Sequence, residues 1–347
     1  MKALTYHGTD RRSWEEVPDQ RISDPEDAVV RVDAVSICGT DLRILEGDGP
    51  EVEAGRILGH EAVGTVVAVG SAVRTVRPGD RVLVSCITSC GRCRHCRAAA
   101  YGQCTGGGGW VLGHRIDGTQ AELVRTPFAD HSLHKLPANV SDEAAVLVAD
   151  ILPTAYEVGV RSGHVGPGDT VAIVGAGPIG LAAVLTARLH SPAGLIVIDP
   201  DTARLDAAKR LGADVTLTPD QHPEEAVRAL TSDGCGAHVV IEAVGIPETF
   251  EMCARLVRSG GHVASVGMHG RPAALHLEDL WIRNTTVTTG LVDTASATVL
   301  LDMLAAGRLD PAGLVTHRFA LDEMPDAYDL FSRAAEAQAL KVVLFRE

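Results

Sequence analysis

The hydrophobic pattern of the chain changes near residue 141. Before that point, short apolar runs rich in valine are separated by Gly, Pro and Asp. Such runs between turn residues predict short β-strands, so we expect a compact β-rich domain. The clearest runs are AVVRVDAVSI, AVGTVVAVG and RVLVS. After Ser141 the sequence becomes rich in Ala and Leu, which favours helices.

Between about residues 170 and 291, strands and helices are predicted to alternate. The strand-like runs are TVAIVG, GLIVID, AHVVIEA, GHVASVG and TVTTG. They are too uniformly apolar for a sheet with one exposed face, and they indicate parallel strands covered on both faces. One intervening helix is predicted to begin after Asp201, an N-cap residue, and to end before Gly212. The fold class is therefore α/β with a doubly wound parallel sheet.

These patterns divide the chain into two domains. The first is expected over residues 1–152 and 292–347, because the tail ends in KVVLF, which predicts a strand that rejoins the β-rich domain. The doubly wound domain is expected over residues 153–291. A chain of 347 residues with 46% hydrophobic side chains is long enough to build two separate cores.

Charge and composition exclude some partners. A formal net charge of -14 disfavours nucleic acid, because binding to its phosphates relies on Lys and Arg. No apolar run reaches the ~18 residues of a membrane helix, and no basic-then-apolar segment precedes the first predicted strand. We therefore expect a cytoplasmic protein with no membrane partner.

Four of the eight cysteines lie within fifteen residues, with the spacing Cys-x2-Cys-x2-Cys-x7-Cys. They are Cys90, Cys93, Cys96 and Cys104. Four thiolates fill every position around a tetrahedral zinc ion and leave none for water or substrate, so the sequence predicts a structural zinc site. An iron–sulfur cluster or free surface thiols are the alternatives. A disulfide framework is disfavoured in a reducing cytosol.

A glycine motif indicates a dinucleotide cofactor. In VAIVGAGPIGLAA a G-x-G-x-x-G pattern stands between a predicted strand and a predicted helix. The motif residues expected to contact the cofactor are Gly175, Gly177, Pro178, Ile179 and Gly180. Asp199 ends the next strand, nineteen residues after Gly180. Its carboxylate would take the ribose hydroxyls and repel a 2′-phosphate, which predicts NAD over NADP.

Arg204 and the glycine motif each have an alternative interpretation that involves no cofactor. Arg204 is predicted to lie along the adenine, and the alternative is a solvated arginine on the helix surface. The alternative for the whole motif is a glycine-rich turn in an α/β domain that binds no ligand.

Cys38 and His60 suggest a second metal site that retains an open position. Cys38 follows one predicted strand and His60 opens the next, which gives a sulfur and a nitrogen ligand suited to zinc. With C-G-T-D, G-H-E-x-x-G, the four-cysteine segment and G-x-G-x-x-G in this order, the chain resembles the zinc-dependent medium-chain alcohol dehydrogenases over essentially its whole length. The nearest branch is the bacterial secondary-alcohol dehydrogenases. The resemblance implies a GroES-like catalytic domain and a Rossmann domain.

The resemblance also implies roles for residues around the catalytic zinc. Cys38 and His60 match its ligands, and Asp150 in VADILPT stands at the position of the third ligand. Glu61 matches a residue that approaches the zinc during ligand exchange. Thr40 matches the hydroxyl that contacts the substrate and begins the proton relay. Buried cysteine and helix cap are the alternative interpretations of Cys38 and Asp150.

At the later position of the relay, many relatives have a histidine where this chain has Arg43. An arginine cannot act as a base, so water or a ribose hydroxyl is expected to carry the proton to solvent.

The same resemblance places residues at the substrate and the nicotinamide. The predicted substrate pocket consists of Cys86, Ile87, Trp110, Leu291 and Val292 together with Thr40, and its apolar lining suits small or medium secondary alcohols and ketones. The residues predicted beside the nicotinamide are Val266, Gly267 and Met268. Lys341 is expected to reach the cofactor ribose or phosphates, with a plain surface lysine as the alternative.

The expected function is reversible hydride transfer between NAD and small or medium alcohols, chiefly secondary ones, with ketones or aldehydes as the oxidised substrates. One catalytic and one structural zinc ion are expected per subunit. The expected assembly is a homotetramer, with a dimer as the alternative. DILPT and DGTQAELVRTP also resemble formaldehyde dehydrogenases and dismutases of the same superfamily. Threonine and polyol dehydrogenases are further alternatives within it. An alternative from another class is an NAD-binding protein without turnover.

Overall fold

The computed structural model describes residues 1–47, 52–231 and 233–347. Their contacts divide the chain into two compact units. One unit comprises Met1–Pro153 and Asp293–Glu347, and the other comprises Thr154–Val292. No helix in these described ranges is both long and apolar enough to cross a membrane.

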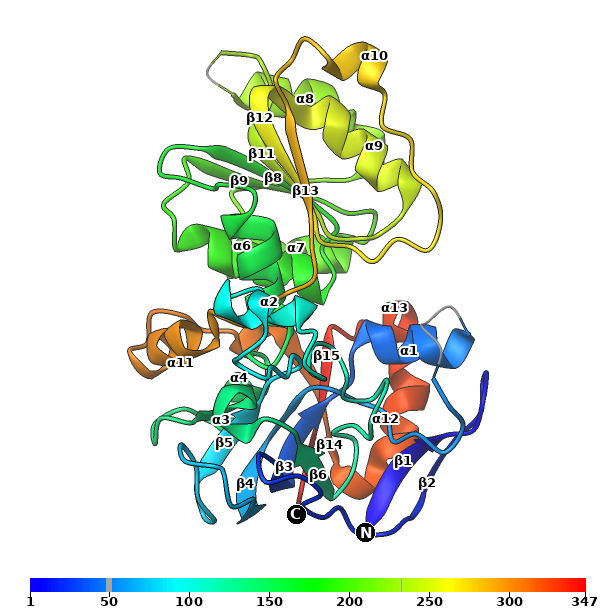
Figure 1. Ribbon diagram of the computed structural model, residues 1–347. Helices are drawn as coiled ribbons and strands as arrows, with labels where there is room; N and C mark the ends of the chain where they lie inside the picture. The colour runs from blue at the N-terminus through cyan, green and yellow to red at the C-terminus, as the bar shows by residue number, and fades with distance from the viewer. Residues whose placement is uncertain (48–51, 232) are drawn as a thin grey trace. The chain divides into compact units, whose positions relative to one another are not determined.

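The first unit is built on a seven-stranded sheet (Figure 1). Its strands are β3 (Ala28–Ser36), β4 (Ala62–Val69), β5 (Arg81–Val84), β6 (Leu123–Thr126), β7 (Leu133–Lys135), β14 (Val315–Ala320) and β15 (Lys341–Phe345). The order is β14-β15-β3-β4-β5-β7, with β6 also paired to β3. A separate antiparallel hairpin consists of β1 (Lys2–Tyr6) and β2 (Arg12–Glu16). The KVVLF tail forms β15 and pairs with β3, which confirms the predicted returning strand.

The helices of this unit are mostly short. They are α1 (Gly39–Glu46), α2 (Arg94–Arg97), α3 (Ala129–Ser132), α4 (Asp142–Val146), α5 (Ile151–Thr154), α11 (Ala297–Ala305), α12 (Met324–Phe331) and α13 (Ala334–Ala337). The core lies between the sheet and α12, where Val32 of β3 and Leu344 of β15 join one apolar cluster with Phe331 of α12. This packing fixes the ends of β3, β4 and β15 near one another.

The second unit is a six-stranded parallel sheet. Its strands are β8 (Thr170–Val174), β9 (Gly194–Ile198), β10 (Val215–Leu217), β11 (Ala237–Glu242), β12 (Val257–Ser265) and β13 (Thr286–Thr289). The order β10-β9-β8-β11-β12-β13 reverses direction at the β8/β11 boundary. In open α/β sheets, ligands bind outside the carboxyl ends of the strands at such a reversal.

Helices cover both faces of this sheet (Figure 1). The helices of this unit include α6 (Pro178–Arg188), α7 (Thr202–Leu211), α8 (Pro223–Leu230), α9 (Pro247–Leu256) and α10 (Leu277–Leu280). α7 begins at its N-cap Asp201 and ends at Gly212, whose φ is 113°, so the predicted limits of this helix are confirmed. The predicted α/β class is also confirmed. Strand β10 was not predicted from the sequence, because VTL is too short to stand out as an apolar run.

Candidate active site and metal centres

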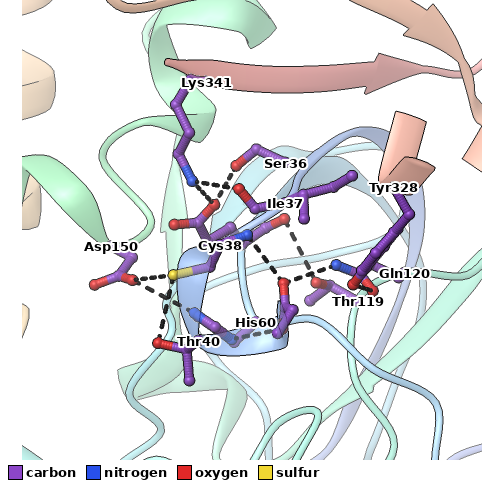
Figure 2. A network of polar contacts seen from close by, with 12 residues as sticks. Ser36, Ile37, Cys38, Thr40, His60, Thr119, Gln120, Asp150, Tyr328 and Lys341 are labelled. Atoms are coloured by element: carbon purple, nitrogen blue, oxygen red, sulfur yellow. Dashed lines mark hydrogen bonds and ion pairs between the residues drawn. The ribbon is translucent and has the colours of Figure 1, made fainter. Parts of the chain in front are cut away.

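Cys38, His60, Glu61 and Asp150 come together at the ends of strands in the first unit. One ligand atom from each lies within 4.8 Å of the others. Cys38 follows β3, and His60 with Glu61 precedes β4; the antiparallel register pairs Val35 with Ala62, so the two segments meet. Figure 2 shows the side chains of Cys38, His60 and Asp150 converging.

The distances within this cluster fit a tetrahedral metal ion. The Cys38 sulfur lies 3.6 Å from Asp150 Oδ2, and His60 Nε2 lies 3.4 Å from the same oxygen. Ligands held about 2.0–2.3 Å from a tetrahedral zinc are roughly 3.3–3.8 Å from one another. A thiol, an imidazole and a carboxylate at these separations are therefore a suitable donor set for zinc.

The electrostatics of the cluster favour a cation. Burial raises the pKa of the Cys38 thiol, and the nearby Glu61 carboxylate raises it further. The Cys38 thiolate and the Asp150 carboxylate would thus lie close together in a partly buried place, where charges are costly unless they are paired. A divalent ion would offset the charges of the Cys38 thiolate and the Asp150 carboxylate.

Lys341 makes a buried ion pair that the sequence analysis missed. Its ammonium contacts the Glu61 carboxylate and donates to Ile37 O at 3.0 Å, while Ser36 donates to the same carboxylate (Figure 2). Lys341 is 1% exposed, so its interpretation as a surface lysine is wrong. A lysine at the start of the apolar strand KVVLF was the available signal. Its contact with a cofactor stays a prediction.

Thr40 and Trp110 lie beside the same cluster. The Thr40 hydroxyl is 3.6 Å from the Cys38 sulfur, at the start of α1. The Trp110 ring lies edge-on to the His60 ring, with 6.2 Å between centroids. Cys86 is buried after β5 and donates its N–H to Ala149 O, next to Asp150. These residues of the predicted substrate pocket therefore surround the metal ligands.

The four clustered cysteines form a second candidate metal centre. Their sulfur atoms lie within 4.8 Å of one another, and the separations of Cys96 from Cys93 and Cys90 are 3.5 and 3.9 Å. These are far longer than the ~2.05 Å of a disulfide. Backbone N–H groups, chiefly that of Cys96, lower the pKa of Cys93 to about 5. The segment therefore presents a metal site with no open position.

The glycine motif of the second unit has the geometry of a phosphate-binding turn. Gly175 has a φ of 101°, and a Cβ at Gly180 would lie 1.8 Å from Gly175 O. Gly177 is the N-cap of α6 and has no atom within 4 Å of the place where its Cβ would be. α6 begins at Pro178, which has no N–H, so the first N–H groups of the helix come from Ile179 onward; they suit an anion at this helix start.

Asp199 lies at the end of β9, close to the glycine turn. It is 5% exposed and accepts hydrogen bonds from Ala176 N at 2.7 Å and Asp201 N at 2.8 Å. Arg204 is on the first turn of α7, with its Nε 3.7 Å from Asp201. The structure thus brings Asp199 to the turn, where a ribose would follow the pyrophosphate.

Val266, Gly267 and Met268 follow β12 at the carboxyl edge of the sheet. Gly267 and Leu291 line one cavity of about 560 Å³ within this unit. The carboxylate of Glu242, at the end of β11, is buried beside it and lies 3.3 Å from His269 Nε2. Sequence reasoning did not identify Glu242, although a carboxylate near the end of the apolar run AHVVIEA was visible.

The remaining pocket residues belong to both units. Ile87 is buried in the first unit, and Val292 is the last residue of the second. The predicted substrate pocket as a whole stays a prediction.

The sequence matches two family models. Residues 24–138 match the alcohol dehydrogenase GroES-like domain, and residues 178–305 match the zinc-binding dehydrogenase model. An alcohol dehydrogenase from Cupriavidus necator is 36% identical, covering 95% of each chain. An NADP-dependent isopropanol dehydrogenase from Thermoanaerobacter brockii is 34% identical over 95% of this chain and 96% of its own. The solved zinc-dependent alcohol dehydrogenase 2 from Streptococcus pneumoniae superimposes with a TM-score of 0.95, at 45% identity over 100% of this chain and 99% of its own.

Proposed function

This chain belongs to the zinc-dependent medium-chain alcohol dehydrogenases, and we propose that it transfers hydride reversibly between small or medium secondary alcohols and NAD. The observation that carries the proposal is the meeting of Cys38, His60 and Asp150 from three separate segments at 3.4–3.6 Å. The residue pattern suggested Cys38 and His60, the resemblance added Asp150, and the distances suit zinc. We propose residues 1–152 with 292–347 as the catalytic domain and 153–291 as the NAD-binding domain.

Cys38, His60 and Asp150 would hold the catalytic zinc. A zinc ion there supplies Lewis-acid chemistry, which lowers the pKa of a bound hydroxyl group by several units. We propose that the Thr40 hydroxyl, 3.6 Å from the Cys38 sulfur, receives the proton of the substrate. Arg43 cannot accept that proton, so we propose that it leaves through water or a ribose hydroxyl. Glu61 is already paired with Lys341 and adds no unbalanced charge.

NAD is the proposed cofactor because of Asp199. The start of α6 would bind the pyrophosphate, and the Asp199 carboxylate at the adjoining strand end would take the ribose hydroxyls. A 2′-phosphate at that place would meet a like charge. The relative from Thermoanaerobacter brockii is named an NADP-dependent isopropanol dehydrogenase. Its named substrate supports our proposal of a secondary alcohol, whereas its named cofactor differs from the one that we propose.

Absorbance at 340 nm with propan-2-ol tests the proposal. We expect NADH to form and a zinc chelator to abolish turnover. With NADP in place of NAD, kcat/KM should be at least about tenfold lower, a difference of ~1.4 kcal/mol. A panel of primary alcohols, secondary alcohols, polyols and formaldehyde defines the substrate class. The proposal would be contradicted by turnover that survives loss of the metal, or by equal activity with both cofactors.

We further propose that the protein assembles as a homotetramer. In the second unit, β13 is an edge strand of the sheet, and apolar side chains of the nearby segment are exposed: Leu277, Trp281 and Ile282 are 61%, 75% and 69% exposed. Exposed apolar groups of this size beside an unpaired strand edge favour association. We expect light scattering to give four times the mass of one chain. A mass of one chain at micromolar concentration would refute the assembly.

A further inference from the structure

A chain of buried polar groups connects helix α12 to the candidate metal centre (Figure 2). The Tyr328 hydroxyl donates to Gln120 Oε1 at 2.7 Å, and Gln120 Nε2 donates to Asp41 Oδ2 at 2.9 Å. The other oxygen of Asp41, Oδ1, faces His60 Nδ1 at 3.7 Å. Helix α12 is thus linked to His60, a candidate metal ligand, through the side chains of Gln120 and Asp41.

The hydrogen-bond partners fix the orientation of each side chain in this polar network. An ionised carboxylate only accepts hydrogen bonds, so Gln120 must present its NH2 group to Asp41. This leaves the amide oxygen of Gln120 toward Tyr328, whose hydroxyl then donates. Tyr328 and Gln120 are 0% exposed, so water does not compete for these bonds. The guanidinium of Arg12 lies 5.0 Å from the Tyr328 ring and packs against its face.

Asp41 in turn sets the orientation of His60. Its Oδ2 also accepts from Cys38 N at 3.0 Å, so two donors hold the carboxylate in place. Its Oδ1 has no hydrogen-bond partner among the described residues and points at His60 Nδ1. A proton on Nδ1 suits this oxygen, which leaves Nε2 on the side of Cys38 and Asp150 with a free lone pair.

The Gln120 side chain also packs against the backbone next to His60. Gly59, the residue before His60, has a φ of 92°, and a Cβ there would lie 2.5 Å from Gln120 Cγ. The side chain of Gln120 therefore occupies the space that Gly59 leaves empty. Gln120 belongs to the segment DGTQAELVRTP, to which the sequence analysis gave no role in the site.

We propose that Gln120 and Tyr328 are positioning residues that hold His60, through Asp41, in the orientation and tautomer needed to bind the catalytic zinc. Neither residue touches a ligand atom, and their effect passes through the Asp41 carboxylate. The inference rests on the proposed function, because it needs a metal at Cys38, His60 and Asp150.

The test uses three variants of the full-length zinc enzyme. Gln120→Leu keeps the size of the side chain and removes both hydrogen bonds, whereas Tyr328→Phe removes only the hydroxyl. Thr126→Val is the matched control: Thr126 is 0% exposed in the same unit, and its hydroxyl has no hydrogen-bond partner among the described residues. The measurements are the rate of zinc release to a chromophoric chelator, the visible spectrum of the cobalt-substituted enzyme, and kcat and KM.

In Gln120→Leu we expect one of the two zinc ions per subunit to be released about tenfold faster, the low end of the effect typical of groups that support metal ligands. The cobalt spectrum should shift and kcat should fall, while KM for NAD stays unchanged. Tyr328→Phe should change the same quantities in the same direction by a smaller factor, and Thr126→Val should match the wild type.

Several outcomes would overturn the proposal. If Gln120→Leu released zinc at the wild-type rate and kept the wild-type cobalt spectrum, this inference would be wrong, but the proposed function would stand. An equal effect of Thr126→Val would assign the change to general loss of core packing. If Gln120→Leu does not fold, an unchanged release rate in Tyr328→Phe decides against the inference. A wild-type enzyme that holds only one zinc ion would remove the proposed function as well.

Discussion

Replacing Cys38 by alanine is expected to lower kcat/KM for alcohol oxidation at least about a thousandfold and to reduce the zinc content from two ions per subunit to one. Zinc lowers the pKa of bound water from 15.7 to about 7, which corresponds to roughly 12 kcal/mol. Losing about a third of this stabilisation, ~4 kcal/mol, slows a reaction about a thousandfold. His60 and Asp150 alone leave the ion with too few ligands, whereas the four-cysteine site is separate.

Metal analysis and absorbance at 340 nm together check this result. Cys235→Ala is the control, since it removes an exposed cysteine that belongs to neither candidate metal group. It should retain both zinc ions and the wild-type rate. If the Cys38 variant kept two zinc ions and normal turnover, the assignment of the catalytic centre would be wrong.

Replacing Cys96 by alanine is expected to remove the other zinc ion and to destabilise the first unit without abolishing the chemistry. Cys96 is 5% exposed, and its sulfur is within 3.9 Å of those of both Cys90 and Cys93. Zinc binding contributes about 10–16 kcal/mol in small zinc-binding peptides. Losing even ~4 kcal/mol of that would lower the melting temperature by about 8–16 °C for a unit of this size.

Calorimetry and metal analysis distinguish this variant from the Cys38 variant. Its remaining zinc should be the catalytic one, so kcat measured well below the melting temperature should stay within about threefold of the wild type. A variant that melts like the wild type would show that this site does not contribute to stability. A complete loss of activity in a folded variant would show that it is not purely structural.

The features that the sequence determined by itself are local. The strand-like runs, the limits of α7, the four-cysteine spacing and the glycine motif each lie within a short segment. Their chemistry depends on residues that are neighbours in sequence, such as Cys93 and Cys96, whose sulfur atoms are 3.5 Å apart. The short strand β10 escaped prediction, because a run of three residues carries no periodicity.

Only the tertiary structure decided which distant side chains meet. The sequence marked Cys38, His60 and Asp150 through a family resemblance, but Cys38 and Asp150 are 112 residues apart and meet through strand register and packing. The pairs Glu61–Lys341 and Gln120–Tyr328 span 280 and 208 residues and had no signal that linked them. Partners across such separations are chosen by the register of β15 on β3 and by the packing of α12. The pattern of polar and apolar residues along the sequence does not contain this information, because it indicates which residues are buried but not which of them contact one another.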